Sequence, residues 1–150
     1  MTMTTEGSTP WRCIISEEGK FDISHPFFHT EGGPRHLIIS SDAVIPKLPA
    51  TIHRTDLNGF LKKLRNNPDI TTLLCEGGGS LARQLFELDL IDEINLTWAP
   101  HTLFGGENAP TITGLSGDFL PSSRHYELAK ITTHQDNEVF LTYYKSQLES

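Results

Sequence analysis

The chain has 150 residues, the length of a single domain, and a chain of this size buries roughly two thirds of its unfolded surface on folding. Twelve Lys and Arg residues against nineteen Asp and Glu give a formal net charge of −7, which argues against a broad basic surface for nucleic acid or for an anionic membrane. No apolar run approaches the ~20 residues of a membrane span, and the N-terminal segment lacks the apolar core of a signal peptide.

The two cysteines, in a chain without a secretory signal, are expected to be reduced, which is consistent with a small cytoplasmic enzyme. Residues 1–9, rich in Thr and Ser, are expected to form a flexible leader. Residues 11–16 predict a short strand, and residues 20–34, with several Gly and Pro, predict a loop. The continuously apolar run within 35–40 indicates a strand covered on both faces, as in a parallel sheet.

A parallel sheet needs crossover helices, and the first is predicted at residues 56–66. Asp56 can cap this helix, its leucines and Phe60 recur at helical spacing, and Asn66, Asn67 and Pro68 follow it. Residues 50–53, just before it, predict a minor strand.

The next segment combines an apolar strand at 71–75, a glycine triplet at 77–79 and an amphipathic helix that opens at Ser80. A second strand follows at 94–100, and Leu103 to Gly106 predict a turn. Residues 126–132 and 139–144 then alternate as the two arms of a β-hairpin. We therefore expect an α/β fold with a C-terminal antiparallel hairpin.

The glycine triplet is the strongest functional signal in the sequence. Glycines let backbone N–H groups approach a phosphate without a Cβ in the way, and the N-terminus of the following helix offers orphan donors and a positive dipole end. The contiguous glycines match neither the Rossmann nor the P-loop spacing. A simple strand-to-helix turn remains the alternative interpretation.

Other kinds of site have little support. His25 and His29 have the spacing of a helical metal pair, but Pro26 separates them and no further ligands complete a site, so we expect no metal. The sequence has no Gly-x-Ser-x-Gly elbow, and neither cysteine has the local signature of a nucleophile.

The run from Leu73 to Leu81, with Glu76, Gly77, Gly78 and Gly79 at its centre, resembles a known family. The resemblance extends to Leu90–Leu96 and to the Ala99, Pro100, Leu103–Gly106 segment, and overall it covers approximately residues 11–145. The chain is similar to the C-terminal reductase domain of the bifunctional riboflavin-biosynthesis deaminase-reductase. It is similar, more distantly, to dihydrofolate reductase, which shares the fold.

This resemblance implies a dihydrofolate reductase-like mixed, mostly parallel sheet flanked by helices. It also implies an NADPH-dependent enzyme that reduces a pyrimidine ribosyl-phosphate to the ribityl-phosphate by hydride transfer. A dihydrofolate reductase-type enzyme and a non-catalytic nucleotide-binding or assembly module remain alternatives. Cofactor titration would separate the enzymes from the assembly module.

The resemblance also assigns residues to the site, although it leaves the catalytic residues unknown. Glu76 matches the acidic residue that reaches the substrate; a solvated strand-end charge is the alternative. Ser16 could lie near the cofactor 2′-phosphate, where the following Glu17 is unfavourable. The residues that match the pyrophosphate loop, with Arg83 and Gln84 at its edge, are Gly77, Gly78, Gly79, Ser80, Leu81, Ala82, Arg83 and Gln84.

The start of the chain departs from the family, whose members carry a longer segment before the strand that begins at Trp11. We therefore expect residues 10–146 to form a reductase domain truncated at its N-terminus, with a sheet edge exposed by the missing strand. An exposed apolar edge must be covered, so we expect a homo-oligomer.

Overall fold

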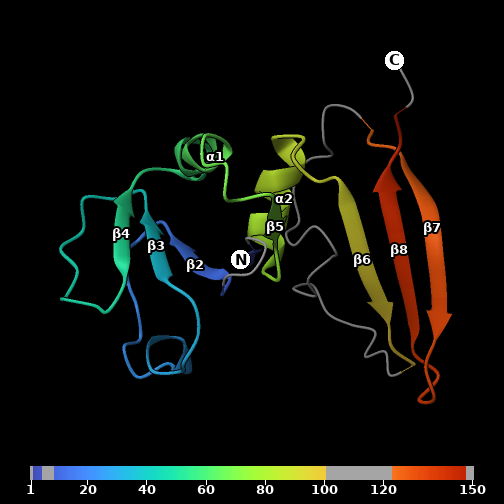
Figure 1. Ribbon diagram of the computed structural model, residues 1–150, viewed down its shortest axis with the longest axis horizontal. Helices are drawn as coiled ribbons and strands as arrows, with labels where there is room; N and C mark the ends of the chain where they lie inside the picture. The colour runs from blue at the N-terminus through green and yellow to red at the C-terminus, as the bar shows by residue number, and fades with distance from the viewer. Residues whose placement is uncertain (1, 5–8, 101–122, 148–150) are drawn as a thin grey trace, which may run out of the picture. The chain divides into compact units, whose positions relative to one another are not determined.

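The computed structural model describes residues 2–4, 9–100 and 123–147. The contacts of the chain divide it into two compact units, Met1–Glu76 and Gly77–Ser150. Figure 1 labels the helices and strands of both units. In the part of the chain that the structure describes, no helix is long and apolar enough to cross a membrane.

The first unit is built on a five-stranded sheet in the order β4-β3-β2-β1-β5. Its three consecutive parallel strands are β2 (Trp11–Ser16), β3 (Arg35–Ile39) and β4 (Thr51–Arg54). The parallel block and the minor strand expected near residues 50–53 are therefore observed. All of β3 except its first residue is buried, which explains its continuously apolar sequence.

Strand β1 (Thr2–Thr4) lies between β2 and β5 (Thr72–Leu74) and pairs with both in antiparallel fashion. This strand falls in the segment expected to be a flexible leader, so residues 2–4 differ from that expectation. Thr is a good strand former, and two partner strands satisfy the backbone groups of a segment whose polar composition suggested a coil.

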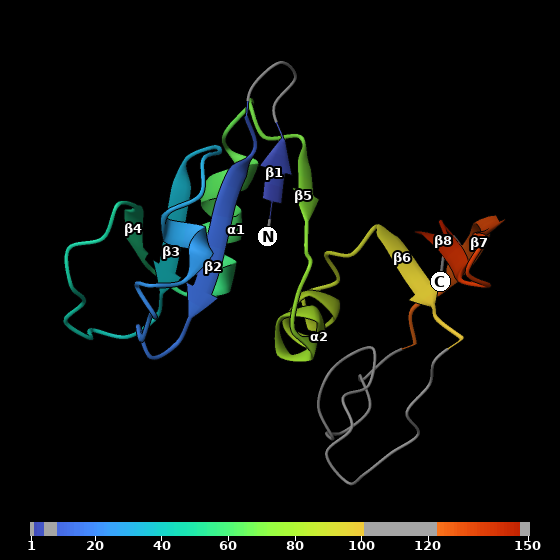
Figure 2. The ribbon, with the colours of Figure 1, turned by 90° about the horizontal axis from the view of Figure 1, so that it is seen from below.

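Helix α1 (Leu57–Arg65) packs on one face of this sheet (Figure 2). The Asp56 carboxylate accepts a hydrogen bond from the Gly59 N–H at 2.7 Å, so the predicted N-cap is confirmed. Phe60 and Leu64 of the helix form a buried cluster with Ile38 and Cys13. Burial raises the pKa of the Cys13 thiol to about 11.

A histidine pair lies beside this core. His36 is only 6% exposed, and its Nδ1 lies 2.9 Å from Nε2 of His53 on the neighbouring strand. The His36 ring stacks on Trp11 with centroids 4.2 Å apart, and the His53 ring meets Phe60 edge-on at 5.0 Å. Among the described residues, Nε2 of His36 is buried without a hydrogen-bond partner. The pair therefore lies between two aromatic rings, with the charge of Lys63 near His53.

The second unit contains α2 (Gly79–Glu87) and a three-stranded antiparallel sheet in the order β6-β8-β7. Its strands are β6 (Glu93–Trp98), β7 (Tyr126–Thr133) and β8 (Val139–Lys145), which lie side by side in Figure 1. The predicted hairpin is thus confirmed. The strand expected at 94–100 pairs with β8 of the hairpin, in a sheet separate from the parallel block. The turn expected at Leu103–Gly106 lies outside the described residues.

Candidate functional site

The glycine segment leads from β5 to α2. Gly78 is the N-cap of α2 and has φ +63° and ψ 128°, a conformation that side chains other than glycine rarely adopt. Gly77, in contrast, is outside the left-handed region. Apart from the chain neighbours, a Cβ at either position would have no heavy atom of the described residues within 4 Å. Packing within these residues therefore does not require a glycine at position 77.

The N-terminus of α2 fits an anion. No side chain in the described part of the chain caps the helix, and its first turn contains no acidic residue. The first hydrogen bond of the helix runs from the Ala82 N–H to the Gly78 carbonyl at 3.0 Å. The N–H groups of the preceding residues point out of the helix end, where the helix dipole favours negative charge. Together with the open surface beside Gly77 and Gly78, this geometry suits a phosphate.

The remaining residues assigned to the phosphate loop lie further along α2. Arg83 Nε pairs with Glu87 Oε1 at 2.6 Å, one turn toward the C-terminal end. The Gln84 carbonyl accepts the Leu88 N–H, and the neighbouring Leu85 is only 2% exposed. The charge of Arg83 is therefore compensated within the helix, and the residues best placed for a phosphate are those from Gly77 to Leu81.

The C-terminal end of α2 is fixed by Asp89, which adopts a left-handed conformation with φ 56°. The Leu90 N–H donates to the Leu85 carbonyl and the Asp89 N–H to the Phe86 carbonyl, which is a Schellman motif. Aspartate replaces the glycine that is usual at this position.

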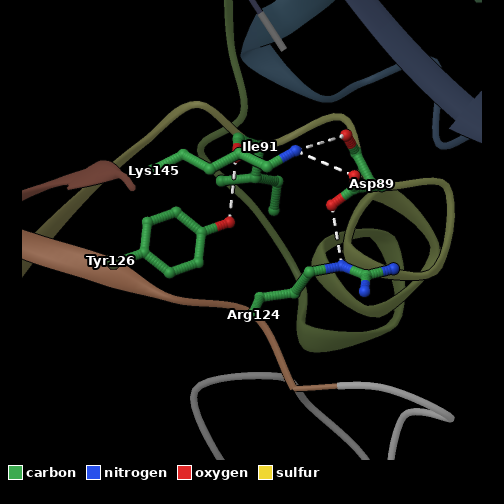
Figure 3. A network of polar contacts seen from close by, with 5 residues as sticks. All are labelled: Asp89, Ile91, Arg124, Tyr126 and Lys145. Atoms are coloured by element: carbon green, nitrogen blue, oxygen red, sulfur yellow. Dashed lines mark hydrogen bonds and ion pairs between the residues drawn. The ribbon is translucent and has the colours of Figure 1, made fainter. Parts of the chain in front are cut away.

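Two cations from the hairpin region pair with the Asp89 carboxylate (Figure 3). The Asp89 carboxylate lies 2.7 Å from Arg124 Nε and 2.8 Å from Lys145 Nζ. The Lys145 hydrogen bond, together with both positive charges, holds the pKa of the Asp89 carboxyl below its usual value. Tyr126 donates to the Ile91 carbonyl at 2.9 Å. This network anchors the end of α2 to the sheet of the second unit.

Ser16 ends β2, and its Oγ accepts a hydrogen bond from the Gly19 N–H at 3.0 Å. Gly19 has φ +69°, so the serine stabilises a tight turn at the end of the strand. Glu17 and Glu18 in this turn are exposed, and Glu18 pairs with Lys20 at 2.6 Å. Among the described residues the Ser16 hydroxyl donates to no acceptor, so its proton can be donated to a phosphate oxygen.

Glu76 is exposed and follows β5 by two residues. It stands at the carboxyl end of that strand, where the sequence expected a substrate contact. Ser16 and Glu76 belong to the first unit, whereas Gly77 to Gln84 belong to the second.

The structure also places a positively charged residue, Arg54, at the same edge of the parallel strands as Ser16, and the sequence analysis did not assign it to the site. Arg54 is the last residue of β4, and a single arginine after a short strand has no motif that would single it out. Its place in the sheet becomes apparent from the pairing of Arg54 with Ile39.

His25 and His29 stabilise their loop instead of facing each other across a metal site. His25 Nδ1 accepts the Phe27 N–H at 3.2 Å and caps a 3-10 helix at Pro26–Phe28. Nε2 of His29 lies 2.7 Å from the Ile23 carbonyl. Within the described ranges, no group of three or more His, Cys, Asp or Glu residues could hold a metal ion.

Comparison with known families decides the identity of the domain. The family described as the RibD C-terminal domain matches residues 2–139. The chain belongs to this family. The resemblance found in the sequence is therefore confirmed. Comparison with curated protein sequences found no significant match.

Solved structures share the fold. A deaminase/reductase from Thermotoga maritima, titled diaminohydroxyphosphoribosylaminopyrimidine deaminase/5-amino-6-(5-phosphoribosylamino)uracil reductase, has a TM-score of 0.71 and 18% identity over 94% of this chain and 39% of its own. A pyrimidine reductase-like protein from Corynebacterium diphtheriae has a TM-score of 0.68 and 16% identity over 90% of this chain and 60% of its own.

Riboflavin Biosynthesis Reductase Rib7 from Saccharomyces cerevisiae has a TM-score of 0.55 and 17% identity over 89% of this chain and 63% of its own. The chain thus spans less than two thirds of each of these three structures. The expected α/β fold is confirmed, with a mixed sheet that contains a parallel block, flanking helices and an antiparallel hairpin.

Proposed function

We propose that this chain is an NADPH-dependent reductase domain of riboflavin biosynthesis that reduces a pyrimidine ribosyl-phosphate to the ribityl-phosphate. The observation that carries the proposal is the match to the RibD C-terminal domain over residues 2–139. The uncapped N-terminus of α2, with its open glycine segment, supports binding of a phosphate-bearing cofactor. Fluorescence titration with NADPH tests it, and a chain that binds neither NADPH nor NADH would contradict it.

Each group has a specific task in this proposal. Backbone N–H groups from Gly78 to Leu81 bind the cofactor pyrophosphate, and Ser16 donates to the 2′-phosphate. Glu76 accepts hydrogen bonds from sugar hydroxyls of the substrate, which a carboxylate at a strand end can do without entering the phosphate loop. The cofactor, when bound, supplies the hydride. We assign no side chain as the proton donor.

The role of Glu76 gives a first prediction. Glu76→Gln is expected to lower kcat/KM for the pyrimidine phosphate about tenfold or more, because a hydrogen bond to a charged acceptor is weakened in the substrate complex. Cofactor affinity should not change. Steady-state kinetics with parallel NADPH titration measure both quantities, and Glu31→Gln, an exposed loop carboxylate, is the control. Undiminished kcat/KM would make Glu76 a solvated strand-end charge.

Glu17 gives a second prediction. If the 2′-phosphate lies at the end of β2, Glu17→Ser removes a like charge and should raise the preference for NADPH over NADH by up to about fivefold. Added salt should shrink the gain. Glu18→Ser is the matched control, because Lys20 already pairs with that carboxylate. A ratio of NADPH to NADH affinity that stays constant at low ionic strength would place Glu17 away from the cofactor.

The homo-oligomer is a further proposal. In the sheet of the second unit, Leu128, Ile131 and Trp98 stand opposite residues 143, 141 and 139 of β8, so they share one face. Their exposed fractions are 48%, 57% and 60%. Large apolar side chains on one face favour coverage by a second protein surface. We expect a dimer or larger species in sedimentation equilibrium, and a monodisperse monomer at micromolar concentration would contradict this.

A further inference from the structure

The carboxyl ends of β2, β3 and β4 form one edge of the parallel block, and the pairing register aligns their last residues. Ser16 pairs with Ile39, and Ile39 pairs with Arg54. Neighbouring strands are about 4.8 Å apart, so Ser16 and Arg54 stand roughly 10 Å from each other, with their side chains on the same face of the sheet. Ligands of open parallel sheets bind at this kind of edge.

Arg54 is held in position by the loop that follows β3. Its Nη1 donates to the Ser41 carbonyl and its Nη2 to the Ala43 carbonyl, both at 3.0 Å. Ala43 also adjoins the turn that Ser16 stabilises, because a Cβ at Gly19 would lie 3.2 Å from the Ala43 Cβ. The guanidinium, the loop and the Ser16 turn therefore form one contiguous cluster.

The charge of Arg54 is not compensated by an ion pair. Arg54 is exposed, and among the described residues no carboxylate forms a salt bridge with it. Arg83 and Lys145, in contrast, each have a carboxylate partner. The two carbonyl contacts use two of the five N–H donors of the guanidinium, so the others can reach a ligand. A cation that is oriented but not neutralised suits a phosphate dianion.

We propose that Arg54 binds the 2′-phosphate of an adenine nucleotide and thereby selects NADPH over NADH. The inference rests on the proposed function and adds to it the residue that supplies the positive charge. An acidic residue at such an edge favours the 2′-hydroxyl of NADH, and an arginine favours the 2′-phosphate of NADPH. Here the exposed Glu17 and Arg54 stand at the same edge, so Arg54 offsets the repulsion that Glu17 exerts on the phosphate.

The test compares nucleotides that differ in the 2′-phosphate. Isothermal titration with 2′,5′-ADP and 5′-ADP probes the adenosine end alone, and titration with NADPH and NADH probes the whole cofactor. Arg54→Gln is expected to weaken 2′,5′-ADP and NADPH at least tenfold while 5′-ADP and NADH keep their affinities. Arg65→Gln, which removes an exposed positive charge from the end of α1, is the control and should change none of the four.

A second variant separates charge from the loop contacts. Arg54→Lys keeps the charge and loses the guanidinium fork, so it should retain most of the preference for the 2′-phosphate, even if thermal unfolding shows that the loop is destabilised. A lysine variant that loses as much selectivity as the glutamine variant would make Arg54 a loop clamp and overturn the inference.

The outcomes also distinguish this inference from the proposed function. A parent chain that binds NADPH and NADH equally, or an Arg54→Gln variant with unchanged selectivity, overturns the role of Arg54 and leaves the reductase function intact. A parent chain that binds neither dinucleotide overturns both.

Discussion

Valine in place of Gly78 is expected to lower the affinity for NADPH at least tenfold, which corresponds to about 1.4 kcal/mol or more. The substitution adds a branched Cβ at the helix end, where the phosphate must approach the backbone. It also forces a valine into φ +63°, so part of the loss can come from a shifted N-terminus of α2.

Gly77→Val separates these two causes. Gly77 is outside the left-handed region, and a Cβ there has no described neighbour within 4 Å, so the variant should fold as the parent does. The same tenfold loss is expected, because the side chain occupies the open surface that we assign to the phosphate. Fluorescence titration measures affinity, and thermal unfolding monitored by circular dichroism verifies the fold. A well-folded Gly77→Val chain with parental affinity for NADPH would show that phosphate binds elsewhere.

Acid is expected to destabilise the first unit through His36 and His53. Burial lowers the pKa of both imidazoles below the ordinary value of about 6.5, and the charge of His53 adds to the effect at His36 and that of Lys63 to the effect at His53. Their hydrogen bond needs one donor and one acceptor nitrogen, so it is lost when both rings are protonated. The enclosing rings of Trp11 and Phe60 offer no carboxylate to stabilise a second proton.

The sign of the effect follows from proton linkage. When the folded pKa is depressed, the unfolded chain binds more protons below pH 6.5, so the stabilising contribution is present above that pH and is lost as the pH falls toward the folded pKa. The limiting slope is about 1.4 kcal/mol per pH unit for each histidine. Urea unfolding between pH 7.5 and 5 measures it.

His36→Phe removes the more buried of the two rings and keeps an aromatic surface against Trp11. The decline in the free energy of unfolding between pH 6.5 and 5 should become shallower than in the parent. His125→Gln, an exposed histidine of the second unit, should leave the decline as it is. An equal pH dependence in the parent and in His36→Phe would show that other groups control the acid response.

Local sequence signals predicted those elements whose stability is local. Asp56 with its periodic apolar residues predicted α1, and the alternation on either side of residue 135 predicted the hairpin of β7 and β8. In the glycine segment, the resemblance to the family supplied the pyrophosphate assignment, and composition alone left a plain turn as an alternative.

Tertiary pairing determined the features that the sequence did not predict. Three residues at the N-terminus form β1 because β2 and β5 supply partners, which no local pattern reveals. Arg54 meets the loop after β3 across thirteen and eleven residues, and His36 meets His53 across seventeen. Each of these contacts depends on strand register, which is determined by the pairing of whole strands and not by any single residue.

The place of β1 in its sheet makes that sheet two hydrogen-bonded blocks joined by one short strand. Strands β4, β3 and β2 form one block and β5 stands apart, and among the described residues β1 alone pairs with both sides. Releasing three residues would break both ladders at once and leave the edges of β2 and β5 without partners, a small local opening compared with global unfolding. The sheet is therefore held together at β1, and once β1 is released another strand can pair with the exposed edges of β2 and β5.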